Sequence, residues 1–231
     1  MIIQIYAFTN IEQAQAAAEF GVDHIGFVAG QYGIVHGELS FDQAYHLAAS
    51  LPPQATRVAL TMATDVDEIV RMADTVRPDI IHISSDPDEV GPAAMEQLRE
   101  RLPDSVRLMK ALPVDDESSI AVAQRFARVS DLLLLDTKMR GLPGVGASGR
   151  THDWSISRRI VERLSIPVIL AGGLTPENVA AAIDVAQPWG VDSNTSTNLP
   201  GDPVAKDFDR IRAFVAAARS ALPMPATGAR S

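Results

Sequence analysis

The residues best suited to acid–base chemistry follow one short apolar run within Asp131–Trp154. The run Leu132–Leu135 is too short to span a membrane and ends on a carboxylate, Asp136, before a stretch rich in glycine and proline. In a parallel α/β protein, a buried strand that delivers an acid to its C-terminal end, followed by a glycine-rich loop, places a catalytic group beside an anion site. A plain strand followed by a long surface loop has the same pattern, so the stretch alone gives only a hypothesis.

Three loops carry the small and hydroxyl-bearing residues that an anion site needs. Gly172 and Gly173 follow an apolar strand pattern, and a helix predicted to start at Thr175–Glu177 would add its positive end. The candidates in the other two loops are Gly146, Ser148 and Gly149, and then Asn194, Thr195 and Ser196. Each loop alone is weak evidence, because a Gly-Gly pair is more often only a turn. Their position after consecutive late strands is typical of the phosphate site of a (β/α)8 barrel.

The elements that must position these groups alternate along the chain. Strand patterns cover Met1–Ala7, Asp23–Ala29, Arg57–Met62, Asp79–Ser84, Val106–Leu112, Asp131–Asp136, Ile166–Ala171 and Trp189–Asp192. Helical patterns cover Ile11–Phe20, Ser40–Ser50, Asp65–Val76, Gly91–Leu102, Asp116–Val129, Ser155–Leu164, the segment from Thr175 onward, and Lys206–Ala221. This alternation predicts an α/β protein with a parallel sheet, and its length favours a single closed (β/α)8 TIM barrel over an open doubly wound sheet. The first helix does not open with G-x-G-x-x-G, so a dinucleotide site is not supported.

Composition excludes several classes of function. The 231 residues include no cysteine, which rules out disulfides, thiolate metal sites and cysteine nucleophiles. A net charge of −9 argues against non-specific nucleic-acid binding. No leader pattern and no apolar run of about 20 residues is present, so a cytoplasmic protein without membrane contact is expected. Residues 1–222 are predicted to form one barrel, and 223–231 a disordered tail.

A closed barrel would gather further side chains at the C-terminal ends of its strands. The candidates there are Tyr6, Ser84, Lys110 and Asp136. His82 would point into the barrel, as a polar core residue or as a base, and His36 lies in the loop after the second strand. A zinc site built from His82 and His36 has no fixed ligand spacing to support it, so no metal is expected.

These residues together resemble the phosphoribosylanthranilate isomerase family, a (β/α)8 barrel of tryptophan biosynthesis, over nearly the whole chain. The matching pieces are Thr9-Asn10, Gly26–Val28, Lys110-Ala111, Leu134–Thr137, Gly146–Gly149 with Asp153-Trp154, Pro167–Asn178, Gly190–Asp192 and Pro200-Gly201. The resemblance implies an Amadori rearrangement, in which a phosphoribosylamine becomes an aminoketose without a metal or other cofactor. One general acid protonates the ring oxygen and one general base removes the C2 proton.

The resemblance assigns the acid to Asp136, but several family positions differ. The family's base is a cysteine at the end of the first strand, and Tyr6 stands there, with an ordinary pKa of about 10 against about 8.5 for cysteine. The arginine that meets the anthranilate carboxylate aligns near His36, which could replace it as an anion contact. The family's Gln-x-His becomes His82-Ile83-Ser84, and its Ser-Ser-Gly-Val-Glu becomes Asn194–Asn198.

Four functions are compatible with this pattern. The first is the pathway isomerase, and a paralogue acting on another phosphorylated sugar fits the departures better. The others are a non-catalytic phosphosugar-binding protein, and a lyase or epimerase that uses Tyr6 or Lys110 as base, or Lys110 as a Schiff-base amine. Each would have a phosphorylated small molecule as its partner. The sequence leaves open whether the protein is a monomer or a homodimer.

Overall fold

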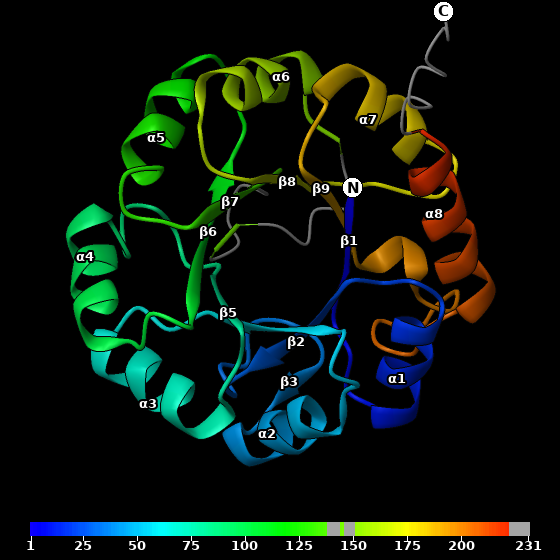
Figure 1. Ribbon diagram of the computed structural model, residues 1–231, viewed down its shortest axis with the longest axis horizontal. Coiled ribbons are helices and arrows are strands. Elements are labelled where there is room, and N and C mark those ends of the chain that lie inside the picture. The colour runs from blue at the N-terminus through cyan, green and yellow to red at the C-terminus, as the bar shows by residue number, and fades with distance from the viewer. Residues whose placement is uncertain (138–143, 146–150, 222–231) are drawn as a thin grey trace, which may run out of the picture.

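Parallel strands close into a barrel surrounded by helices in the computed structural model, which describes residues 1–137, 144–145 and 151–221 (Figure 1). The barrel closes because β1 pairs with both β2 and β9. Its strands are β1 (Ile2–Ile5), β2 (His24–Ala29), β4 (Thr56–Thr61), β5 (Ile80–Ile83), β6 (Arg107–Pro113), β7 (Leu132–Asp136), β8 (Val168–Leu170) and β9 (Gly190–Ser193). The helices around it are α1 (Ile11–Glu19), α2 (Phe41–Ser50), α3 (Val66–Val76), α4 (Pro92–Arg101), α5 (Ser118–Phe126), α6 (Trp154–Arg163), α7 (Val179–Ala186) and α8 (Phe208–Ser220). The predicted (β/α)8 barrel is confirmed.

Helix starts follow the local capping residues. The Asn10 side chain accepts a hydrogen bond from Gln13 N at 3.0 Å and caps α1. Ser40 and Gln43 form a capping box at the start of α2. Each cap satisfies backbone N–H groups that have no partner inside the helix, so the sequence is enough to place these boundaries.

Three differences from the predicted elements affect the loops at the C-terminal ends of the strands. The loop after β2 contains a two-residue strand, β3 (Glu38–Leu39), which pairs with the end of β2. Helix α7 begins at Val179 rather than Thr175, because Asn178 closes the intervening turn by accepting from Thr175 N at 2.8 Å. Helix α8 begins after its cap at Asp207, so Lys206 lies before the helix.

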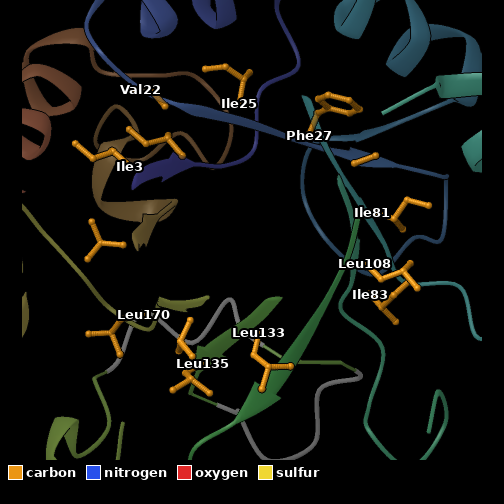
Figure 2. Close-up of a cluster of buried hydrophobic side chains, with 14 of the residues drawn as sticks. Ile3, Val22, Ile25, Phe27, Ile81, Ile83, Leu108, Leu133, Leu135 and Leu170 are labelled. Atoms are coloured by element: carbon orange, nitrogen blue, oxygen red, sulfur yellow. The ribbon is translucent and has the colours of Figure 1, made fainter. Parts of the chain in front are cut away.

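Side chains alternate between two layers along each strand. The outward layer is apolar and packs against the helices, and Figure 2 shows its members around the strands, among them Ile3, Ile25, Phe27, Ile81 and Leu133. The inward layer mixes apolar residues such as Val58, Ile80, Met109 and Leu132 with polar ones. The outward layer therefore holds the barrel together, while the inward layer carries the polar groups.

No helix within the described residues is long and apolar enough to cross a membrane. The tail predicted for residues 223–231 lies outside the described part of the chain.

Candidate active site

A cavity of about 410 Å³ opens at the C-terminal ends of the strands. Its lining includes seven residues that the sequence singled out: Tyr6, His36, His82, Ser84, Asp136, Asn194 and Thr195. It also includes Asp192, which the sequence analysis did not select. Residues 144 and 145 lie over the end of β5, where Val145 N donates to Ser84 O and Ser84 Oγ donates to Val145 O, each at 2.9 Å. The Ser84 hydroxyl therefore holds this segment at the cavity wall.

Asp136 ends β7 with its carboxyl group in the cavity. It shares the inward face with Leu132 and Leu134, and its Oδ1 accepts from Thr137 N at 2.6 Å. Burial raises the pKa of Asp136 from its ordinary value of 3.8 to about 7, although the Thr137 N–H acts in the opposite direction. A carboxyl group with this pKa holds its proton near neutrality, as a general acid must.

This raised pKa predicts a pH-dependent effect of Asp136→Asn on stability. A carboxyl whose folded pKa exceeds its unfolded pKa stabilises the fold fully below about pH 4, and this contribution is lost as the pH rises through 7. Asparagine does not titrate. Between pH 4 and 7 the free energy of unfolding of the wild type should therefore fall relative to that of the variant. Urea unfolding of both proteins at pH 4.5, 6 and 8 measures the difference. A difference that is constant with pH would contradict a raised pKa.

Tyr6 is buried across the barrel from β5. Its hydroxyl hydrogen-bonds His82 Nδ1 at 2.9 Å, and the two rings meet edge to face. Burial, and then the charge of Asp192, raise the pKa of Tyr6 well above its ordinary value of 10. The phenol therefore keeps its proton at neutral pH, which does not support the base role predicted for it.

The Tyr6 ring occupies space that a glycine leaves open. A Cβ on Gly26 would lie 2.4 Å from the ring carbons Cδ1 and Cε1. We expect Gly26→Ala to lower the free energy of unfolding by about 1–3 kcal/mol, because overpacking a filled interior forces side chains to shift. The same substitution should have a much smaller effect in a Tyr6→Cys background, where the ring is absent. Urea unfolding of the four proteins of this cycle measures the coupling, and equal effects in both backgrounds would refute the steric account.

Asp192 lies on β9 and points into the cavity as the second carboxyl group there. It is 9% exposed, and its Oδ1 accepts from Gln4 Nε2 at 3.0 Å. Burial raises its pKa to about 8; the Gln4 hydrogen bond and the charge of Lys206 oppose the rise, and the charge of Asp136 adds to it. The sequence contained a signal for this residue, since it ends the predicted strand Trp189–Asp192, where barrel enzymes place catalytic groups.

Lys206 is a buried cation beside this site. It is 4% exposed, and its Nζ donates to the backbone oxygen of Tyr6, to Asn198 Oδ1 and to Asn194 Oδ1. Burial lowers its pKa to about 7, and the charge of Asp192 acts in the opposite direction. Lys206 was predicted to begin the last helix and was therefore not among the predicted site residues.

Lys110, one of the predicted pocket residues, does not line the cavity. Its neighbours Leu108 and Leu112 on the same face of β6 belong to the outward layer, so strand alternation directs Lys110 away from the barrel interior. Its Nζ donates to the backbone oxygens of Ile83 and Ser85 and lies 5.9 Å from the centre of the Phe126 ring on α5. The predicted place of Lys110 in the pocket is therefore wrong, and a Schiff base there has no access to a ligand.

Two of the three predicted phosphate loops lie side by side. Ser193 Oγ and Ser196 Oγ both donate to Leu174 O, at 3.1 and 2.6 Å, which joins the loop after β9 to the loop after β8. Gly172 and Gly173 have φ angles of 86° and 61°, a conformation that favours glycine and turns the backbone sharply after β8. The third loop, with Gly146, Ser148 and Gly149, lies outside the described residues.

Asn194 connects the phosphate side of the cavity to the end of β1. Its Oδ1 accepts from Ala7 N at 3.0 Å and from Lys206 Nζ at 3.4 Å. Its Nδ2 makes no hydrogen bond within the described residues, and the side chain lines the cavity. The amide is therefore held in place with a donor left for a ligand.

Comparisons with known proteins agree with this architecture. The family described as N-(5'-phosphoribosyl)anthranilate (PRA) isomerase matches residues 3–217. The N-(5'-phosphoribosyl)anthranilate isomerase of Methanothrix thermoacetophila is 37% identical over 211 residues, which cover 90% of this chain and 96% of that protein. The protein of the same name from Haloferax volcanii is 34% identical, with 95% and 93% covered.

Solved structures give the same result. The phosphoribosyl anthranilate isomerase of Thermotoga maritima superposes with a TM-score of 0.79 at 29% identity, covering 95% of this chain and all of that one. A phosphoribosyl anthranilate isomerase in complex with reduced 1-(o-carboxyphenylamino)-1-deoxyribulose 5-phosphate superposes with a TM-score of 0.77 at 27% identity, covering 95% of this chain and 100% of that one. The resemblance seen in the sequence is confirmed: the chain belongs to the phosphoribosylanthranilate isomerase family.

Proposed function

We propose that this protein catalyses the isomerisation for which its family is named, with phosphoribosylanthranilate as substrate and an aminoketose phosphate as product. The observation that carries the proposal is the Asp136 carboxyl, which ends β7 inside the cavity with a pKa near 7. Identity above 30% to isomerases that the chain covers almost completely supports the same reaction.

Asp136 is the proposed general acid. Its proton passes to the ring oxygen of the phosphoribosylamine as the bond between C1 and that oxygen breaks, and the nitrogen lone pair forms a C=N bond. The carboxyl group is protonated near neutrality because burial disfavours its charged form. Transfer of this proton leaves a carboxylate beside the cationic intermediate, where it offsets the new charge.

The phosphate is proposed to bind where the loops after β8 and β9 meet. Gly172 and Gly173, where the backbone turns after β8, are proposed to offer backbone N–H groups, and Asn194 and Thr195 on the cavity wall, with Ser196 beside them, to add side-chain or backbone donors. The Ser196 hydroxyl already donates to Leu174 O, so its contribution is its backbone N–H. Gly146, Ser148 and Gly149 are proposed to complete the site from the loop after β7.

The exposed His36, at the cavity rim, is proposed to meet the anthranilate carboxylate in place of the family's arginine. A lyase that uses Lys110 is not supported, since Lys110 lies outside the cavity. A binding protein without catalysis is less well supported, because a carboxyl group with a raised pKa ends β7 at the family's acid position.

Growth without tryptophan tests the proposal in cells. The chain is expressed in a bacterial strain that lacks its own phosphoribosylanthranilate isomerase, with the empty vector as the negative control and a known isomerase as the positive control. Growth comparable to the positive control is expected. Absence of growth, with the protein present at the level of the positive control, would reject the function.

A further inference from the structure

We infer that Asp192 is the general base of this protein and accepts the C2 proton that a cysteine accepts in the family. This inference rests on the proposed function, because it names a second catalytic residue for the same reaction. Four observations carry it: the shared cavity, the orientation of the carboxylate, a buried cation beside it, and the poor fit of the other candidates.

Asp192 and Asp136 line one cavity from β9 and β7, the strands on either side of β8. Asp192 is buried and Asp136 is half-buried, and the charge of Asp136 further raises the pKa of Asp192. Two carboxyl groups that repel each other in this way release their protons in separate steps. Between those steps, the pair consists of one protonated acid and one carboxylate base, as an acid–base isomerisation requires.

A chain of hydrogen bonds fixes the Asp192 carboxylate. His24 Nδ1 lies 3.0 Å from Gln4 Oε1, and Gln4 Nε2 donates to Asp192 Oδ1 at 3.0 Å. Burial, and then the charge of Arg107, lower the pKa of His24 to about 3, so this histidine is neutral and donates through Nδ1–H. Gln4 is thereby held with its amide nitrogen towards Asp192. The other oxygen, Oδ2, has no hydrogen-bond partner among the described residues and is left for substrate.

Lys206 favours the ionised form of Asp192, because its charge lowers the pKa of that carboxyl group. The three N–H groups of its ammonium group donate to three acceptors, on Tyr6, Asn194 and Asn198. No cation among the described residues acts on the pKa of Asp136, which burial raises and the Thr137 N–H lowers. A cation beside one member of a coupled pair favours the carboxylate on that member. Without substrate, the pKa of Asp192, about 8, lies above that of Asp136, about 7, so the proposed order needs the cationic nitrogen of the bound intermediate as well as Lys206 to draw the negative charge onto Asp192.

The other residues in reach are poorer bases. The Tyr6 phenol has a raised pKa, and among the described residues its hydroxyl group makes a hydrogen bond only with His82 Nδ1. Burial, and then the charge of Lys110, lower the pKa of His82 to about 3, so its neutral ring attracts a proton weakly. His82 Nε2 is buried without a hydrogen-bond partner among the described residues. Neither residue therefore presents to the substrate an accessible atom with a high affinity for a proton, as Asp192 does with Oδ2.

After Asp136 has opened the ring, Asp192 Oδ2 removes the C2 proton, the electrons of the C2–H bond form a C1=C2 bond, and the C=N electrons return to nitrogen. The product of this step is an enol that carries the amine on C1. The enol then becomes the ketone as its hydroxyl loses a proton and C1 gains one. No oxidant, reductant or metal enters this sequence, and the atoms of substrate and product are the same.

Asp192→Asn tests the inference, with three companions. We expect kcat on phosphoribosylanthranilate to fall by about 100- to 10,000-fold, the contribution of a general base. Tyr6→Phe should lower kcat less, by at most about tenfold, because it removes no base. Asp184→Asn, a matched change on the exposed face of α7, should leave kcat unchanged. With substrate deuterated at C2, Asp192→Asn should show a larger kinetic isotope effect than the wild type, since C2–H cleavage becomes rate-limiting.

Binding of reduced 1-(o-carboxyphenylamino)-1-deoxyribulose 5-phosphate separates catalysis from structure. Affinity and melting temperature close to those of the wild type, together with the loss of kcat, support the inference. Near-wild-type kcat in Asp192→Asn overturns it, as does a loss of kcat that is accompanied by lost affinity and no change in the isotope effect. A wild type that does not convert the substrate rejects the proposed function and this inference with it, whereas an active wild type with an active Asp192→Asn rejects the inference alone.

Discussion

Asp136→Asn is expected to lower kcat on phosphoribosylanthranilate by about 100- to 10,000-fold, which is the usual contribution of a general acid. The amide cannot donate a proton to the ring oxygen at a useful rate, so ring opening must depend on water. KM should change little, because the carboxyl group is proposed to act on the reacting atoms rather than on the phosphate. Steady-state kinetics with purified wild type and variant measure both constants.

The loss must come from chemistry and not from unfolding. Asparagine is nearly isosteric with aspartate and removes a buried titrating group, so the variant should be at least as stable as the wild type at pH 8. The same Asp184→Asn control on α7 shows whether the loss of one negative charge is by itself enough to lower kcat. A variant that is folded and retains more than about a tenth of the wild-type kcat would remove Asp136 from the role of acid.

Lys206→Met is expected to give the largest loss of stability, about 3 kcal/mol in the free energy of unfolding. The substitution keeps most of the buried side-chain volume but removes the donor to Tyr6 O, Asn198 Oδ1 and Asn194 Oδ1. Tyr6 O and Asn198 Oδ1 then lie in the interior without this donor, whereas Asn194 Oδ1 keeps its hydrogen bond from Ala7 N, and Asp192 loses its neighbouring cation. For a chain of this size, the melting temperature should fall by roughly 6–12 °C.

A surface ion pair gives the matched control. Arg101 on α4 contacts Asp67 at 2.5 Å with 43% of its side chain exposed, so Arg101→Met should change the free energy of unfolding by less than about 1 kcal/mol. Urea unfolding of the two variants beside the wild type gives both values. Equal effects from the two substitutions would show that the buried contacts of Lys206 add nothing beyond an ordinary surface charge.

Local patterns were enough to predict the barrel. Alternating apolar strands and capped helices determine where most elements begin, as Asn10 and Ser40 do for α1 and α2. The start of α7 was predicted wrongly because Thr175, Pro176 and Glu177 satisfy the usual rules for a helix start. In the structure, the side chain of Asn178 binds back to Thr175 N and Gly173 O and stabilises a turn there instead.

The site was predictable only in part, because its decisive contacts join residues far apart in sequence. Asp136 could be identified from its place at the end of an apolar run. The environment of Asp192 depends on Gln4, and on Lys206, which comes from a segment that was predicted to be helical. Lys110 was misplaced for a different reason: the strand was predicted correctly, but the face on which each residue lies was not worked out from the alternation with Leu108 and Leu112.

The rate at which the purified wild-type protein consumes phosphoribosylanthranilate is the most direct test of the proposed isomerisation. We expect formation of the aminoketose phosphate with a kcat/KM of about 10⁴ M⁻¹s⁻¹ or more, in the range typical of enzymes, although no cysteine is present. A rate no faster than that of the substrate alone in buffer, from protein that still binds reduced 1-(o-carboxyphenylamino)-1-deoxyribulose 5-phosphate, would contradict it. The protein would then be a phosphosugar-binding member of its family without the family's activity.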